Sequence, residues 1–118
     1  MNIKLYAYKN CDTCRKAKKY LDENGDNYEL IPIREQPPTK VELKIMQANY
    51  DGNIRKLFNT SGSDYKVFNL KEKLPNMTGA EAIDLLSKNG NLIKRPFAIK
   101  GKTGVVGFRE STWDDLFL

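Results

Sequence analysis

The segment Lys9–Lys16, with the sequence KNCDTCRK, contains both cysteines of the chain, Cys11 and Cys14. A strand-like alternation of apolar and other residues, Ile3–Tyr8, precedes this segment. After it, apolar residues recur with helical spacing as far as Leu21. The cysteine pair is therefore expected on a turn that leads from a strand into the N-terminus of a helix.

That position favours a reactive thiol. The unpaired N–H groups and the dipole at a helix N-terminus stabilise an anion, so we expect Cys11 to react as a thiolate near neutral pH. Cys14 follows one helical turn later, where it can attack a mixed disulfide formed at Cys11 and release the product. Oxidation should accordingly give a reversible disulfide between Cys11 and Cys14.

Two other interpretations of the pair are less favoured. A structural zinc site needs about four ligands, usually Cys or His, and the chain has no histidine and only these two cysteines. Inert, buried cysteines are the second alternative, and the charged neighbours of the pair disfavour it. The absence of histidine also excludes Cys-His and Ser-His-Asp catalysis, so local charge and the helix dipole must activate the nucleophile.

The composition is that of one globular domain, residues 1–118, with 40% hydrophobic and 30% charged residues. No apolar run approaches the ~18 residues of a membrane span. The chain opens with a strand and not with a signal peptide, and its cysteines have a redox spacing, so we expect a cytoplasmic protein. The net charge of +5 is scattered among acidic residues, which favours a solvated surface over nucleic-acid binding. We expect a monomer.

The first third of the chain predicts a βαβ unit. Gly25 follows the helix and can adopt the left-handed conformation that ends it. A second strand is expected around Tyr28–Ile31. Strand, helix and strand within ~30 residues predict a right-handed crossover between parallel strands.

The middle of the chain, about residues 37–90, is predicted to be helical. Pro37-Pro38 separates it from the βαβ unit, and two Thr-x-x-Glu capping boxes begin helices within it. The expected order is a helix from Thr39 to Asp51, a short helix over 53–58, a turn over 59–62, a helix from a Ser63-Asp64 cap to Leu74, and a helix from Thr78 to Asn89.

The tail predicts a β-hairpin and a last helix. Strands over 97–99 and 105–108 flank a loop over 101–104. Ser111 is expected to cap a short helix whose Trp113, Leu116 and Phe117 pack on the sheet. The fold class is therefore α/β: a thioredoxin-like fold whose small mixed sheet is flanked by helices, with the helical insertion between its βαβ and ββα halves.

Five ordered motifs spanning nearly the whole chain resemble the ArsC/Spx family. They are Cys11-x-Thr13-Cys14-Arg15-Lys16-Ala17, Pro37-Pro38-Thr39, Lys56-Leu57-Phe58-Asn59-Thr60-Ser61-Gly62, Leu92-Ile93-Lys94-Arg95-Pro96 and Gly107-Phe108. This family contains glutaredoxin-coupled arsenate reductases, Spx transcriptional regulators that bind RNA polymerase, and uncharacterised arsenate-reductase-like proteins. The Lys56–Gly62 stretch and Trp113 resemble the uncharacterised branch.

The resemblance implies roles for individual residues. Cys11 corresponds to the family nucleophile, and Arg95 to an arginine that arsenate reductases place against the oxyanion. A planar cationic fork matches a tetrahedral oxyanion and stabilises a thiolate. Pro96 resembles the cis proline that thioredoxin-like folds hold beside the active cysteine. Thr13, Arg15, Asn59 and Arg109 are implied as oxyanion-binding or supporting residues.

Two departures from the arsenate reductases matter. Asn59 stands where those enzymes carry an arginine, so one cation of the oxyanion site is replaced by a neutral side chain. The chain also adds Cys14 as an internal resolving thiol, and Asp12 places a negative charge beside the nucleophile. Weak or absent arsenate reduction is therefore expected.

The resemblance implies a thiol-disulfide oxidoreductase that uses Cys11, Cys14 and Arg95. It implies no bound cofactor or metal, with glutathione and glutaredoxin, or thioredoxin, as the reductant. The substrate is expected to be a small thiol, a disulfide or an oxyanion, or a redox protein partner. The alternative is an Spx-type regulator, in which a disulfide switch alters binding to the RNA polymerase alpha subunit.

Overall fold

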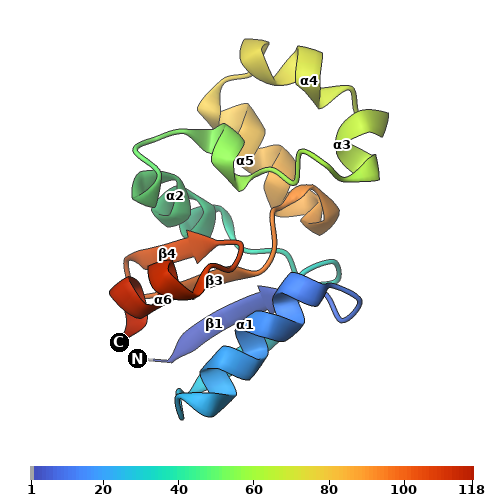
Figure 1. The fold of residues 1–118 in the computed structure, drawn as a ribbon. Helices are drawn as coiled ribbons and strands as arrows, with labels where there is room; N and C mark the ends of the chain where they lie inside the picture. Colours follow the sequence, from blue (N-terminus) through green and yellow to red (C-terminus); the bar gives the residue numbers. More distant parts are fainter. Residues whose placement is uncertain (1) are drawn as a thin grey trace.

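The computed structural model describes residues 2–118 and contains a four-stranded mixed sheet with the strand order β2-β1-β3-β4 (Figure 1). Strands β1 (Ile3–Ala7) and β2 (Tyr28–Pro32) pair in parallel. Strands β3 (Phe97–Lys100) and β4 (Thr103–Val106) form an antiparallel hairpin, and β3 also runs antiparallel to β1. The predicted thioredoxin-like α/β fold is confirmed.

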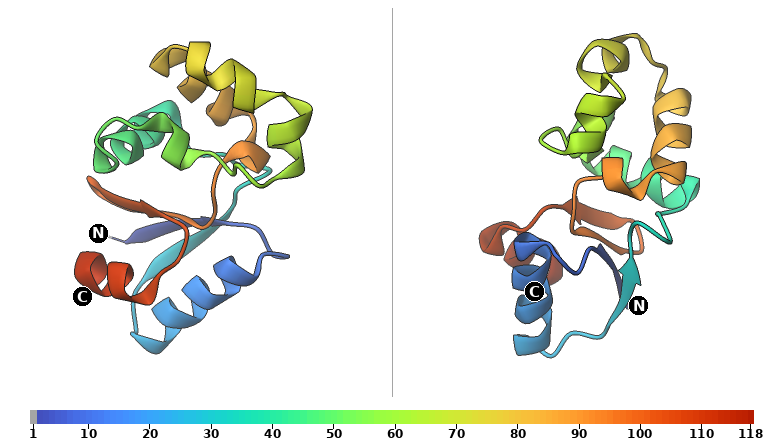
Figure 2. Two further views of the ribbon diagram at one scale, coloured as in Figure 1. Left: turned by 45° about the horizontal axis from the view of Figure 1, so that its top comes forward. Right: turned by 90° about the vertical axis from the view of Figure 1, so that its right-hand side faces the viewer.

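Helices cover both faces of this sheet (Figure 2). Helices α1 (Asp12–Glu23) and α6 (Glu110–Phe117) pack on one face, around a core that includes Leu5, Leu21 and Trp113. Helix α2 (Lys40–Asn49) and the segment that follows it cover the other face. That segment comprises η1 (Ile54–Leu57), α3 (Ser63–Val67), α4 (Leu70–Lys73), η2 (Leu74–Asn76), α5 (Gly79–Lys88) and η3 (Gly90–Leu92).

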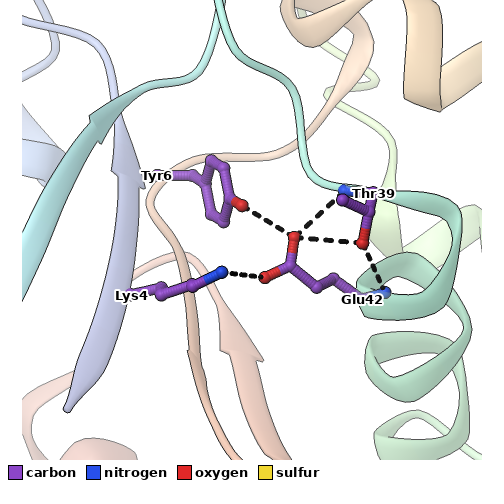
Figure 3. Close-up of polar contacts among 4 residues, drawn as sticks. All are labelled: Lys4, Tyr6, Thr39 and Glu42. Atoms are coloured by element: carbon purple, nitrogen blue, oxygen red, sulfur yellow. Dashed lines mark hydrogen bonds and ion pairs between the residues drawn. The ribbon is translucent and has the colours of Figure 1, made fainter.

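Both predicted capping boxes are present. The Thr39 hydroxyl accepts from the Glu42 N–H, and the Glu42 carboxylate accepts from the Thr39 N–H; Thr78 and Glu81 repeat the arrangement at α5. Glu42 does more than cap its helix. Its carboxylate also accepts hydrogen bonds from the Tyr6 hydroxyl at 2.7 Å and from the Lys4 ammonium at 3.2 Å, which connects α2 to β1 (Figure 3).

The predicted helix from Ser63 to Leu74 was wrong in two respects. Gly62 is the N-cap of α3, and no side chain caps that end. The helix is also interrupted, because Asn69 adopts the left-handed conformation with φ 52° between α3 and α4. Asparagine tolerates this conformation better than most residues, so the break falls at a residue suited to it.

The hairpin loop is shorter than predicted, because Thr103 and Gly104 belong to β4. Gly104 lies under α2: a Cβ atom there would be 2.8 Å from the Met46 sulfur. The glycine therefore serves a close approach of helix and strand, and Gly101, with φ 61°, makes the turn. Strand β4 ends at Val106, before Gly107-Phe108.

The last helix begins two residues earlier than a Ser111 cap requires. Arg109 is the N-cap of α6 without a side-chain hydrogen bond, and Ser111 lies inside the first turn. Trp113 is fully buried and Phe117 packs against the same core, as predicted. Leu116 was also predicted to pack on the sheet, but it is 39% exposed and lies outside this core. Within residues 2–118, no helix combines the length and apolar character that crossing a bilayer requires.

Candidate redox site

Cys11 is the N-cap residue of α1. Its backbone is extended, with φ −114° and ψ 116°, and its sulfur accepts a hydrogen bond from the Cys14 N–H at 3.2 Å. The Cys11 side chain is only partly buried and its thiol is free. The sulfur therefore occupies the place of the oxygen in an ordinary helix cap, where an anion is stabilised by the end of the helix.

Cys14 has a different environment. It is 4% exposed, and burial, followed by its contact with Cys11, raises the pKa of its thiol to about 12. The backbone of Tyr8 and the positive charge of Arg95 act in the opposite direction without cancelling this effect. At neutral pH Cys14 is thus a protonated thiol, held within the first turn of the helix that Cys11 caps.

Arg95 lies close enough to the cysteines for its charge to act on Cys14. Its guanidinium carbon is 5.4 Å from the centre of the Tyr8 ring, and Arg34 stacks closer on that ring, at 3.7 Å. The Nη1 atom of Arg95 is buried without a hydrogen-bond partner in residues 2–118. The peptide bond between Arg95 and Pro96 is cis, as the resemblance implied.

Arg15 is held at the surface by two neighbouring groups. One of its nitrogens lies 2.7 Å from an Asp12 carboxylate oxygen and another donates to the Lys9 carbonyl at 3.0 Å. The Asp12 side chain is 87% exposed. The two opposite charges lie side by side at the surface, so the expected repulsion from Asp12 is partly compensated by Arg15.

The other candidate residues line two neighbouring surface hollows. Thr13 and Arg109 contribute to a hollow of about 490 Å³, and Asn59 to one of about 420 Å³. Lys56 and Lys94 line both hollows. The fold thus brings Thr13 and Arg109 together, whereas Asn59 lies in the adjoining hollow.

The Asn59 side chain covers Gly62, where a Cβ atom would be 2.7 Å from its Nδ2. Its backbone is fixed as well, because its N–H donates to the Leu92 carbonyl at 2.8 Å. Asn59 therefore belongs to a well-defined turn beside the hollow.

Sequence reasoning gave no role to Lys56, Lys94 or Tyr8. The two lysines lie inside motifs that resemble the family, and their place in those motifs was the one feature of the sequence that could have pointed to a functional role for them. Tyr8 lies at the end of the predicted first strand, and only the folded chain brings Arg34 and Arg95 to its ring. In residues 2–118, no three or more His, Cys, Asp or Glu side chains are grouped so that they could hold a metal ion.

Comparison with known proteins identifies the family. The family model described as "ArsC family" matches residues 6–116. The chain belongs to the ArsC family. Its sequence is 45% identical over 115 residues to the uncharacterized protein YusI of Bacillus subtilis, with 98% of each chain covered.

A solved structure and a second relative are also similar to this ArsC-family chain. A crystal structure of an ArsC family related protein from Bacteroides fragilis superposes with a TM-score of 0.90 at 41% identity, covering 98% of this chain and 97% of the other. The global transcriptional regulator Spx of Listeria monocytogenes is 28% identical, over 92% of this chain and 81% of its own length. The proteins that this chain is similar to thus include both an ArsC family related protein and a transcriptional regulator.

Proposed function

We propose that the chain is a thiol-disulfide oxidoreductase of the arsenate-reductase-like branch, with Cys11 as nucleophile and Cys14 as resolving thiol. The observation that carries this is the cap of α1, where a partly exposed Cys11 sulfur accepts the Cys14 N–H. The same arrangement holds the second thiol beside the first, buried and protonated until it is needed.

The reaction proceeds by two thiol-disulfide exchanges. The Cys11 thiolate attacks one sulfur of a substrate disulfide, the substrate S–S bond breaks, and one thiolate leaves. The Cys14 sulfur then attacks Cys11, and its proton goes to the second departing thiolate. The substrate gains two electrons, and the protein keeps a Cys11–Cys14 disulfide.

An external dithiol or thiol must then reduce that disulfide. Glutathione with glutaredoxin, or thioredoxin, has a reduction potential in the range that can reduce a Cys-x-x-Cys disulfide. Arg95 supports the cycle as a cation whose charge favours the thiolate of Cys14. Its buried Nη1, which has no hydrogen-bond partner in residues 2–118, is the donor that we assign to an anionic sulfur or a substrate oxyanion.

Trapping the intermediate tests this function. Cys14→Ser should form a mixed disulfide with a model disulfide at Cys11, detected by intact-protein mass spectrometry and peptide mapping. Cys11→Ser should form none under the same conditions. A Cys14→Ser protein that gives no adduct, or an adduct on Cys11→Ser that forms as fast, contradicts the assigned roles.

The Spx relative supports a second candidate, a redox-switched regulator that binds the RNA polymerase alpha subunit. Because Cys11 is the N-cap of α1, a disulfide to Cys14 changes the end of a helix. The purified alpha subunit should then bind the reduced and oxidised proteins with different affinity. Turnover of a disulfide substrate without any such binding favours the enzyme.

A further inference from the structure

The two hollows beside the cysteine site form one continuous cationic surface. The first, of about 420 Å³, is lined by Asn53, Arg55, Lys56, Phe58, Asn59, Thr60, Ser61 and Lys94. The second, of about 490 Å³, shares Lys56 and Lys94 and adds Arg109, Thr13 and Thr112. Gly107 makes room for this junction, since the Lys94 side chain lies 3.3 Å from where its Cβ would be.

The charges on this surface are not neutralised by the protein. Neither lining includes an aspartate or a glutamate. In residues 2–118 each ion pair involves another cation: Lys4, Arg15, Lys18, Lys19, Lys40 or Lys88. The positive charges on this surface are thus available to an external group, namely those of Arg55, Lys56, Lys94 and Arg109. Elsewhere on the chain, acidic residues are interspersed with basic ones.

Neutral hydrogen-bonding groups stand between these cations. Asn59, Thr60 and Ser61 line the first hollow. The turn that carries them is fixed by backbone hydrogen bonds, from the Asn59 N–H to the Leu92 carbonyl and from the Gly62 N–H to the Asn59 carbonyl. Such groups suit peptide carbonyl and N–H groups as well as carboxylates.

The second hollow borders the first turn of α1, the helix that Cys11 caps, although neither cysteine lines it. Thr13 follows the Cys11 cap by two residues in the first turn of α1, and it lines the same hollow as Arg109 and Lys94. A protein segment bound at Cys11 would therefore pass close to the hollow that Thr13 lines, and that hollow shares Lys56 and Lys94 with the hollow that contains Arg55.

We propose that this surface binds an extended, acidic peptide segment that flanks the disulfide of a protein substrate. The proposal rests on the proposed function and names its substrate class. The cations are distributed over two adjoining hollows, with Arg55 in the first, Arg109 in the second, and Lys56 and Lys94 in both, and this distribution suits several carboxylates along an extended chain. Four cations are few for a nucleic acid, whose binding usually neutralises more phosphates.

Binding is tested without chemistry, in the Cys11→Ser/Cys14→Ser protein. A short, fluorescently labelled peptide of alternating glutamate and glycine should bind by fluorescence anisotropy, and a lysine-glycine peptide of equal length should not. Lys56→Gln/Lys94→Gln in the same background should weaken binding roughly tenfold, as expected for two exposed charge pairs of favourable geometry.

Lys44→Gln/Lys66→Gln is the matched control, because it removes the same charge from exposed residues that line neither hollow. It should leave the affinity within about twofold, given that exposed charges elsewhere act weakly. Equal losses in both double variants, displacement of the peptide by equimolar inorganic phosphate, or tighter binding of single-stranded DNA would overturn the proposal.

A second experiment, which follows mixed-disulfide formation, distinguishes failure of this inference from failure of the proposed oxidoreductase function. Cys14→Ser should form mixed disulfides faster with an acidic disulfide peptide than with a basic one, and Lys56→Gln/Lys94→Gln should abolish that preference. Adduct formation at Cys11 without charge preference retains the oxidoreductase and rejects the acidic substrate. Peptide binding without any adduct retains the surface and rejects the oxidoreductase.

Discussion

At the scale of single residues, the two cysteines differ because of where the first turn of α1 places them. Cys11 stands before the first helical residue and is partly exposed, whereas Cys14 faces the core formed with Ala17 and Leu21. The same three-residue spacing therefore yields one accessible sulfur and one protected sulfur.

We predict that Cys11 is alkylated before Cys14. Burial and the Cys11 contact raise the pKa of Cys14 to about 12, so its thiolate is scarce at neutral pH. Iodoacetamide labelling followed by peptide mapping between pH 6 and 10 measures this. Both residues should label at similar rates in urea, and faster labelling of Cys14 in the folded protein would contradict the role assigned to each thiol.

Arsenate turnover is predicted to be weak or absent. Asn59 supplies no charge at the position where arsenate reductases carry an arginine, and losing one charged donor costs ~1.5–3 kcal/mol, or about 10- to 100-fold in affinity. Asn59→Arg should raise turnover and Arg95→Ala should lower it. Steady-state assays with glutaredoxin or thioredoxin systems measure both, and efficient wild-type turnover that Arg95→Ala leaves unchanged would refute this account.

At the scale of elements, the sequence predicted best what neighbouring residues decide. Both capping boxes are satisfied within four residues, and the structure confirms them. The need for glycine at position 104 depends instead on Met46, which is distant in sequence. Ser111 had the right type for a cap, but the chain enters α6 at Arg109, and a local motif does not specify that entry.

The candidate site shows the same division. The Cys11–Cys14 motif and the helix that follows it could be predicted from residues that are close together in the sequence. The cationic surface draws Lys56, Lys94 and Arg109 from three segments, and only the packing of the helical segment against the β3–β4 hairpin brings them together.

The Glu42 network is predicted to stabilise the protein in a pH-dependent way. Burial disfavours the Glu42 carboxylate, but hydrogen bonds from Tyr6, the Thr39 backbone and Lys4 outweigh burial and lower its pKa. Because the folded pKa lies below the unfolded value of ~4.3, this stabilisation is present above that value and is lost as pH falls through the folded pKa.

Tyr6→Phe removes one of the hydrogen bonds to Glu42 and should cost about 1–2 kcal/mol of unfolding free energy at pH 7, since a hydrogen bond to a charged group is lost. Urea denaturation at pH 7 and pH 3 measures the difference, which should shrink at the lower pH. Tyr28→Phe is the comparison, because its hydroxyl bonds the exposed Asp22. A constant difference at both pH values would refute the network.

At the scale of the whole molecule, the helical segment is fixed to the sheet by very close backbone contacts. A Cβ atom at Gly90 would lie 1.9 Å from the Ile33 carbonyl oxygen, just beyond the end of β2. Backbone there cannot yield as a flexible side chain can, so η3 and the end of β2 require glycine at this position.

Gly90→Ala is therefore predicted to destabilise the fold by ~3 kcal/mol or more, in the range of severe backbone and packing clashes. Thermal and urea denaturation measure the loss. Gly79→Ala is the control: its nearest neighbour would be 3.8 Å away and it lies in the first turn of α5, so alanine should be neutral or slightly stabilising. Equal stability of the two variants would contradict the contact.

The sulfur cap of α1 has a spectroscopic consequence. The Cys14 amide donates to Cys11, so the backbone reports directly on what happens to that sulfur. When Cys11 becomes part of a disulfide, its sulfur is a weaker hydrogen-bond acceptor than a thiolate. The hydrogen bond that protects the Cys14 amide from exchange with solvent is then weakened. The ¹⁵N–¹H resonance of Cys14 should then shift, and its hydrogen exchange should accelerate, while amides in the middle of α1 change little. One resonance thus gives the oxidation state of the ¹⁵N-enriched protein without a substrate, a thiol-reactive reagent or an added enzyme.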